Sequence, residues 1–147
     1  MGRSWIWLEE QPLAQVLFYP MLDDRTAVDQ DLNQVGHFIW TNQSNYAAWS
    51  AYLAPLAPGS GNLPPYTVAA RRGELNGLPQ AWLGVCSLDL FANENKNYTQ
   101  RLRDAGVDCQ IECVKGVPHA FEAICPEAEV SKRFVGSAIA FLKRTLD

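Results

Sequence analysis

A strand–helix–strand pattern constrains this chain more than any other feature. Residues 78–86 form an apolar run that predicts a buried strand, and residues 107–114 predict a second strand. Between them, residues 93–106 predict a helix, because Tyr98 and Leu102 lie four positions apart on one face. Two strands that are joined through a helix usually lie parallel in one sheet. The sequence therefore predicts an α/β fold.

An acid follows the first of these strands, and a histidine follows the second. The two residues are Asp89 and His119. Because the carboxyl ends of neighbouring parallel strands lie at the same edge of a sheet, we expect the two side chains to meet there. A carboxylate that accepts a hydrogen bond from histidine Nδ1–H fixes the imidazole tautomer and stabilises the imidazolium. This pair is typical of the acid–base half of a Ser-His-Asp triad.

Short motifs around these two residues extend the pattern. They are Gly77-Leu78-Pro79, Leu88-Asp89-Leu90, Ala105-Gly106-Val107 and Pro118-His119-Ala120-Phe121, with a further match at residues 15–23. Together they resemble the C-terminal part of an α/β-hydrolase of the hormone-sensitive-lipase-like esterase family. Ala120 stands where that family has glycine, and Asn93 stands where it has a second acid, whereas Glu94 is kept.

The resemblance runs from about residue 13 to residue 147 and carries expectations for fold and chemistry. It implies a partial α/β-hydrolase fold, with about three parallel strands, the last three of the family sheet, flanked by helices. It also implies hydrolysis of carboxylic esters, in which Asp89 orients His119 and His119 acts as general base and then as acid. No metal ion or organic cofactor is implied.

The nucleophile that this resemblance leads one to expect is absent from the sequence. The family carries it as a serine in a G-x-S-x-G turn, and neither this motif nor the H-G-G oxyanion motif occurs in the 147 residues. Ser60 and Ser87 are the serines to test as substitutes. We therefore predict a truncated carboxylesterase-like or lipase-like hydrolase that is inactive alone. Two alternatives are an esterase completed in trans by a chain with the nucleophile, and a non-enzymatic binding or assembly module.

Residues 13–19, beginning at Leu13 and ending at Tyr19, predict a strand that Pro20 terminates. By resemblance this is the sixth strand of the family sheet, and the fifth strand has no counterpart in the sequence. An unpaired strand edge is a template for pairing with another chain. We therefore predict a homodimer, edge to edge across a two-fold axis, through this strand or through the apolar residues 5–8.

The turn after this strand carries two acids, Asp23 and Asp24. Aspartate side chains stabilise turns through local hydrogen bonds, so we expect a structural role for them. On charge alone, Arg71 or Arg72 is a candidate ion-pair partner for one of the two.

Three further segments have recognisable patterns. A helix capped by Thr41 or Asn42 is expected up to residue 53, with one packed side made of Tyr46, Trp49, Ser50 and Leu53. Residues 54–67 are rich in proline and glycine and predict a loop. A last helix is expected to begin near Pro126 and to pack on the sheet through Val130, Phe134, Val135, Ala138, Ile139, Leu142 and Leu146.

The four cysteines and the second histidine predict no metal site. Cys86, Cys109, Cys113 and Cys125 lack the paired spacing of a zinc site and are expected to be reduced core residues. A disulfide between Cys86 and Cys109 is conceivable but is not predicted. His37 has no accompanying acid or cysteine, and we expect a structural or surface role for it.

Composition bounds the remaining possibilities. With 48% hydrophobic residues, the chain can bury a core, and we expect one domain over residues 1–147 with a divergent segment at residues 1–12. A net charge of −4 offers no basic patch for nucleic acid or an anionic membrane. No apolar run approaches the roughly 20 residues of a membrane span, and residues 1–12 do not resemble a signal peptide. The expected location is cytoplasmic.

Overall fold

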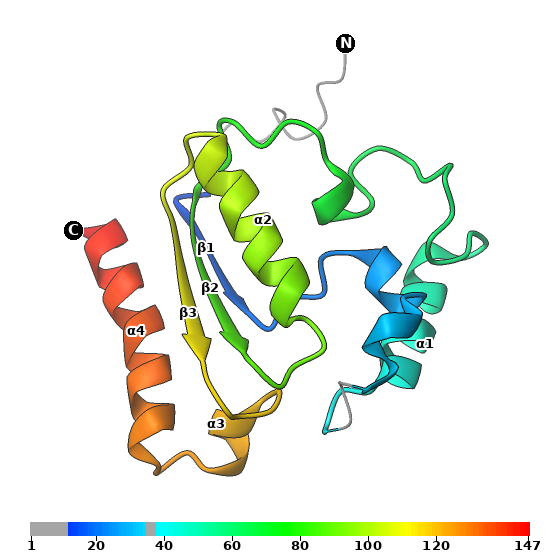
Figure 1. Cartoon of the computed structure of the whole chain (residues 1–147). Helices are drawn as coiled ribbons and strands as arrows, with labels where there is room; N and C mark the ends of the chain where they lie inside the picture. The colour runs from blue at the N-terminus through cyan, green and yellow to red at the C-terminus, as the bar shows by residue number, and fades with distance from the viewer. Residues whose placement is uncertain (1–11, 35–37) are drawn as a thin grey trace.

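The computed structural model describes residues 12–34 and 38–147, and its centre is one parallel sheet (Figure 1). The sheet contains β1 (Ala14–Phe18), β2 (Gln80–Cys86) and β3 (Cys109–Val114) in that order. In the register, Ala14 lies opposite Gln80 and Ala81 lies opposite Cys109. The predicted arrangement of three parallel strands is confirmed, although β1 and β3 are shorter than the apolar runs suggested.

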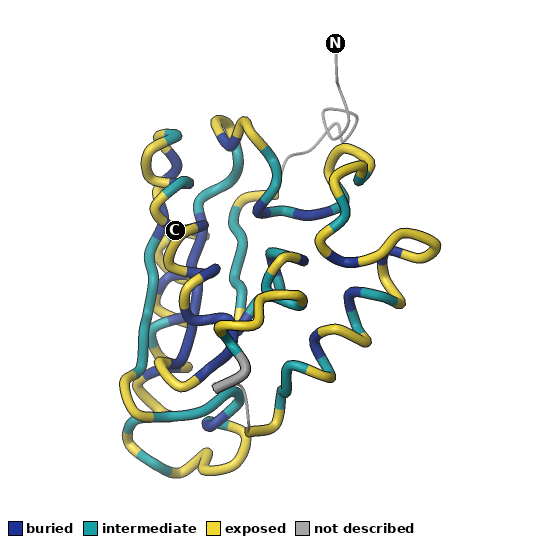
Figure 2. The backbone as a smooth tube through the Cα atoms, turned by 45° about the vertical axis from the view of Figure 1, so that its right-hand side comes forward, coloured by how far each residue is buried: buried dark blue, intermediate teal, exposed yellow. Residues whose placement is uncertain are grey.

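Two long helices sandwich the sheet. α2 (Ala92–Asp104) covers one face, where Tyr98 and Leu102 pack with Ala81 and Leu83 of β2. α4 (Glu129–Leu146) covers the other face, and its buried aromatic residues pack on Trp82. Side chains alternate between the two faces along β2 because successive residues of a strand point in opposite directions. β2 is therefore buried along almost its whole length (Figure 2).

The remaining elements lie in the connections. After β1 come η1 (Asp24–Ala27), η2 (Gln30–Gln34), α1 (Asn42–Leu53) and η3 (Ala69–Arg71), and a one-turn helix, α3 (Phe121–Ile124), precedes α4. α1 lies beside η1, away from the sheet (Figure 1). Residues 5–8 and His37 lie outside the described residues. Within the described part, no helix is long and apolar enough to cross a membrane.

The expected cap of α1 is present, but its packed side differs from the prediction. The Thr41 hydroxyl accepts a hydrogen bond from the Ser44 backbone N–H at 3.1 Å. The buried positions of α1 are Asn45, Trp49 and Leu53, whereas Tyr46 is half exposed. The prediction is confirmed for Trp49 and Leu53, which pack with Val68 of the following loop, and it is wrong for Tyr46, because Asn45 takes the buried position in that turn.

The last helix begins at Glu129, three residues later than predicted, because residues 126–128 form a turn. Its buried positions are Ser131, Phe134, Ala138 and Phe141. Four of the residues expected to pack on the sheet are instead exposed, namely Val135 (37%), Ile139 (48%), Leu142 (38%) and Leu146 (69%). We call these four residues the α4 stripe. The helix is apolar over a wide arc, and only one side of that arc faces the sheet.

An ion pair ties the turn after β1 to the loop that leads into β2. Arg71 and Asp24 form it, with Nε to Oδ1 at 2.6 Å and Nη2 to Oδ2 at 2.7 Å. Asp24 is fully buried and also accepts a hydrogen bond from the Gly59 backbone N–H. Asp23 pairs instead with Arg25. A buried, multiply bonded pair of this kind fixes the loop in one position.

All four cysteines are free thiols, so the conceivable Cys86–Cys109 disulfide is not formed. Cys86 and Cys109 are buried, as expected for core residues. The expectation was wrong for Cys125, which is exposed because it lies in the turn between α3 and α4.

A substitution at Gly84 of β2 tests how closely α4 packs on the sheet. A Cβ atom at this position would lie 2.4 Å from Trp82 Cη2 and 2.5 Å from Phe134 Cζ. We expect Gly84→Ala to lower the free energy of unfolding by about 2–3 kcal/mol, since the two rings must shift to admit a methyl group. Denaturant unfolding measures the change.

The matched control is Gly136→Ala on the exposed side of α4, where a Cβ atom meets nothing within 4 Å. This variant should gain up to about 1 kcal/mol, because alanine favours the helix over glycine. Equal stabilities for the two variants would contradict the close packing.

Candidate functional site

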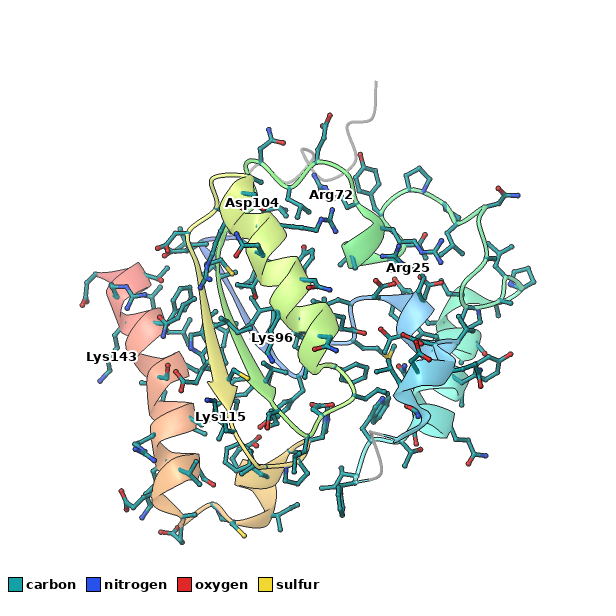
Figure 3. The ribbon with its side chains drawn as sticks, in the orientation of Figure 1. Arg25, Arg72, Lys96, Asp104, Lys115 and Lys143 are labelled. Atoms are coloured by element: carbon teal, nitrogen blue, oxygen red, sulfur yellow. The ribbon has the colours of Figure 1, made fainter. Side chains whose placement is uncertain are left out.

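Asp89 and His119 meet at the carboxyl edge of the sheet. Asp89 lies in the turn after β2, where its backbone N–H donates to the Cys86 carbonyl at 3.2 Å. His119 lies in the loop between β3 and α3, a few residues after Lys115, which marks the end of β3 in Figure 3. The His119 Nδ1 atom is 2.8 Å from Asp89 Oδ2. The two strand ends therefore place the acid and the histidine in hydrogen-bonding contact.

The Asp89 carboxylate is held firmly from both sides. Its side chain is completely buried, and Oδ1 accepts a hydrogen bond from the Phe91 backbone N–H at 3.1 Å. A carboxylate accepts hydrogen bonds and has none to donate, so His119 Nδ1 carries the proton in this contact. In a neutral imidazole, this leaves Nε2 as the atom with a free lone pair. The arrangement can take up and return a proton at Nε2.

The loop that carries His119 is tied to the turn that carries Asp89. The Gly116 backbone N–H donates to Ser87 Oγ at 2.8 Å, and the Leu88 N–H donates to the Val117 carbonyl at 3.3 Å. Ala120, the residue after His119, has φ +56°, in the left-handed region that glycine adopts more readily. The glycine-to-alanine replacement noted in the sequence therefore falls at a position with a real backbone constraint.

Three aromatic rings surround the His119 imidazole. Ring centroids lie 4.7 Å away for Tyr19, 5.9 Å for Phe91 and 6.1 Å for Trp40. The His119 side chain keeps 16% of its surface exposed, so solvent still reaches part of the residue. No sequence motif predicts these aromatic residues at the site. For Tyr19 a signal existed, because it follows β1 at the same edge of the sheet as Asp89 and His119.

Neither substitute serine reaches His119 in the described part of the chain. Ser87 Oγ accepts from Gly116, and Ser60 Oγ is buried without a hydrogen-bond partner in the Pro-rich loop. The two glutamates near this edge have different partners, since Glu94 accepts from the turn after β1 and Glu122 accepts from Tyr19. Within the same residues, no group of three or more His, Cys, Asp or Glu side chains is arranged to hold a metal ion.

Glu94, in the first turn of α2, is buried and hydrogen-bonds to the turn after β1. Its Oε1 atom accepts from the backbone N–H groups of Leu22 at 2.7 Å and Asp23 at 3.2 Å, and its Oε2 atom accepts from the Thr26 hydroxyl. Burial raises the pKa of Glu94 to about 7. The hydrogen bonds stabilise the carboxylate and lower the pKa, but their effect is smaller than that of burial. The side chain fixes the start of α2 to the turn after β1.

Comparison with known proteins identifies the family. The profile of the alpha/beta hydrolase fold matches residues 5–123, which is most of the chain. The chain therefore belongs to the α/β-hydrolase family. No curated protein sequence matches it significantly.

Solved structures of esterases share the fold. The esterase LipW from Mycobacterium marinum is 27% identical with a TM-score of 0.80, over 91% of this chain and 41% of LipW. A bacterial heroin esterase is 28% identical with a TM-score of 0.82, over 92% of this chain and 43% of that enzyme. An esterase of the bacterial hormone-sensitive lipase family, 20% identical with a TM-score of 0.76, supports the fold alone, over 95% of this chain and 46% of that enzyme. The chain thus spans less than half the length of these proteins.

Glu94 should make stability depend on pH. Its pKa is raised in the folded chain from 4.5 to about 7, so folding favours the protonated form. This contribution is complete below pH 4.5 and disappears as the pH rises through 7. Relative to Glu94→Gln, the wild-type chain should lose about 3 kcal/mol of unfolding free energy across this range.

Urea unfolding at several pH values measures this difference, and Glu74→Gln at an exposed position is the control. A pH-independent difference between wild type and Glu94→Gln would refute the raised pKa.

Proposed function

We propose that this chain supplies the Asp–His acid–base half of a carboxylic ester hydrolase, and that its nucleophilic serine comes from a separate stretch of polypeptide. The observation that carries the proposal is the 2.8 Å contact between buried Asp89 and partly exposed His119. LipW and the heroin esterase, which are both above 25% identity and both described as esterases, support the reaction class. The sequence has no G-x-S-x-G motif, and neither Ser87 nor Ser60 hydrogen-bonds to His119, which supports a serine from outside this stretch.

The proposed reaction has two acyl-transfer steps. In the first, His119 Nε2 takes the serine proton while the serine oxygen attacks the ester carbonyl carbon, and the imidazolium then protonates the departing alcohol. In the second, His119 takes a proton from water, the resulting hydroxide oxygen attacks the acyl carbon, and the serine leaves with the proton. Asp89 remains a carboxylate throughout and stabilises the imidazolium. The chain contributes proton transfer and its orientation, while the partner segment contributes the nucleophile.

Hydrolysis of a short-chain nitrophenyl ester tests this division of labour. The purified chain should be no more active than its His119→Ala variant. Co-expression with the N-terminal part of a related esterase that carries G-x-S-x-G should give turnover. In that complex His119→Ala should lower kcat by at least about 10³-fold, and so should removal of the partner serine, because the residues of a triad act as a unit.

Turnover by the chain alone that disappears in His119→Ala would instead reveal a nucleophile within it, and Ser87 and Ser60 would be replaced next. A productive complex that tolerates His119→Ala would refute the proposed role of the pair.

A second candidate function is a non-enzymatic assembly module that forms a homodimer through β1. Within the described residues, β1 pairs only with β2, so its other edge has unpaired backbone groups. Phe18 at the end of β1 is 40% exposed. Unpaired edges of this kind recruit further strands. A second copy can extend the sheet across a two-fold axis, with its own β1 antiparallel to the first.

The α4 stripe supports the same interface. On one side of α4, Ser137 and Arg144 hydrogen-bond to Gln110 of β3, so the stripe, on the other side, is turned towards β1. Val135 and Ile139 also line a groove of about 380 Å³ together with Glu122, which binds the residue after β1. The stripe residues recur at intervals of four, three and four, the spacing of a helix–helix seam. The same two-fold axis would bring two α4 helices together.

The dimer is tested by measuring mass in solution at micromolar concentration. The wild-type chain should have twice its monomer mass of 16.4 kDa. Ile139→Glu should shift the population to monomer, because the dimer would bury an unpaired charge in the seam. Ala140→Glu, at the neighbouring exposed position of α4, is the matched control and should leave the dimer intact. A wild-type monomer at this concentration contradicts the interface.

A further inference from the structure

We propose that Tyr19 and Glu122 together position the His119 imidazole, as a brace between the end of β1 and the start of α3. The two residues act on the reaction through His119, which Tyr19 contacts and Glu122 reaches through Tyr19, so they are positioning residues. The catalytic role of this brace rests on the proposed function. Its structural part, the orientation of His119, is tested without any catalysis.

Tyr19 is held in an unusual backbone conformation at the end of β1. Its φ is +48°, which is rare for a bulky side chain. The backbone is nevertheless fixed, because the Tyr19 N–H donates to the Gly84 carbonyl of β2 at 2.9 Å. Residues in strained conformations often occur where a side chain must be held at a functional site. Here the conformation accompanies a tyrosine ring placed against His119.

The ring of Tyr19 lies between the imidazole and the core. Its centroid is 4.7 Å from that of His119, with the planes at 43°, and 5.6 Å from that of Phe134, nearly stacked at 26°. Tyr19 is only 7% exposed. The Tyr19 ring therefore packs against the imidazole on the side of the core. Because Tyr19 is buried and also packs on Phe134, its own ring is restrained.

The phenol group of Tyr19 closes the brace. Its hydroxyl donates to Glu122 Oε2 at 2.5 Å. Glu122 is in α3, which starts directly after Ala120, so the hydrogen bond reaches the segment on the far side of His119. Burial raises the pKa of Tyr19, which keeps the phenol protonated and able to donate. The loop that carries His119 is thus connected to β1 by both a ring contact and a hydrogen bond.

The brace supplies a restraint that Asp89 cannot. The Asp89 hydrogen bond fixes one atom of the imidazole, Nδ1, but the ring can still pivot about the line from Nδ1 to Oδ2. The Tyr19 ring, tilted by 43° against the imidazole at a centroid distance of 4.7 Å, limits that rotation and so restricts where Nε2 points. Proton transfer requires such groups within about 0.5 Å and 10–20° of their working geometry. Tyr19 sets the plane of the ring, and Glu122 keeps Tyr19 in place.

Imidazole nitrogen NMR tests the brace directly. The chain contains two histidines, so a His37→Gln background leaves the signals of His119 alone. In this background we expect a single Nδ1–H tautomer with a slowly exchanging proton. Tyr19→Phe keeps the ring and removes the hydroxyl, and it should speed exchange of that proton roughly five- to tenfold, the scale of losing one hydrogen bond. Glu122→Ala should behave like Tyr19→Phe.

Two control variants separate positioning from a general loss of structure. Glu122→Gln retains an oxygen that accepts from the tyrosine, so it should restore the wild-type exchange rate. Tyr98→Phe removes the hydroxyl of another buried tyrosine, on the other face of the sheet, and should leave His119 unchanged. Wild-type exchange in Tyr19→Phe, or equal acceleration in Tyr98→Phe, would overturn the proposal.

Kinetics distinguish a failure of the brace from a failure of the proposed function. In the complemented esterase, Tyr19→Phe should lower kcat about three- to tenfold with KM unchanged, since the substrate does not contact the phenol. A complex without turnover, combined with the expected NMR changes, would refute the esterase function and leave the brace standing. If Tyr19→Phe keeps the wild-type exchange rate of the His119 proton while the complex shows turnover that depends on His119, the brace is refuted and the esterase function is not.

Discussion

The burial of β2 is the constraint on which the rest of the structure depends. This strand pairs on both edges and is covered on both faces, by α2 on one side and α4 on the other. Its fixed position determines where the turn with Asp89 begins. Because β3 is bonded to β2 along its length, the loop with His119 starts from the same edge. The acid and the histidine meet because two neighbouring strands end together.

The sequence predicts the elements well where one physical rule decides them. The apolar run at residues 78–86 identifies β2, which is buried on both faces, and the alternation of apolar and polar residues over 109–114 is typical of a half-buried strand such as β3. The Thr41 cap and the Tyr98–Leu102 spacing likewise locate α1 and α2. The prediction fails for α4, where Ile139 and Phe141 are equally apolar but only Phe141 faces the sheet. Periodicity gives the width of an apolar arc, and the packing partner decides which part of it is buried.

The contact between Asp89 and His119 follows from topology, whereas the aromatic surroundings of His119 do not. Trp40 comes from a connection whose path no local pattern specifies. The place of Tyr19 directly after β1 predicts that it lies at this edge of the sheet, but nothing in the sequence predicts its φ of +48°, which propensity argues against for tyrosine. Glu122 has no recognisable motif, and its role depends on the direction of the Tyr19 hydroxyl. The side-chain contacts of these residues depend on tertiary geometry and lie beyond single-sequence reasoning.

The edge of the sheet and the histidine are physically linked through β1. Phe18 is half exposed at the end of this strand, and the next residue, Tyr19, packs on His119. A chain that pairs with β1 would bury Phe18 and restrict the backbone that presents Tyr19. A partner at this edge, whether a second copy or another chain, would therefore lie next to the ring that packs on the imidazole. The Tyr19 backbone and hydroxyl are already bonded to Gly84 and Glu122 within the single chain, so such a partner would meet an imidazole that is already oriented.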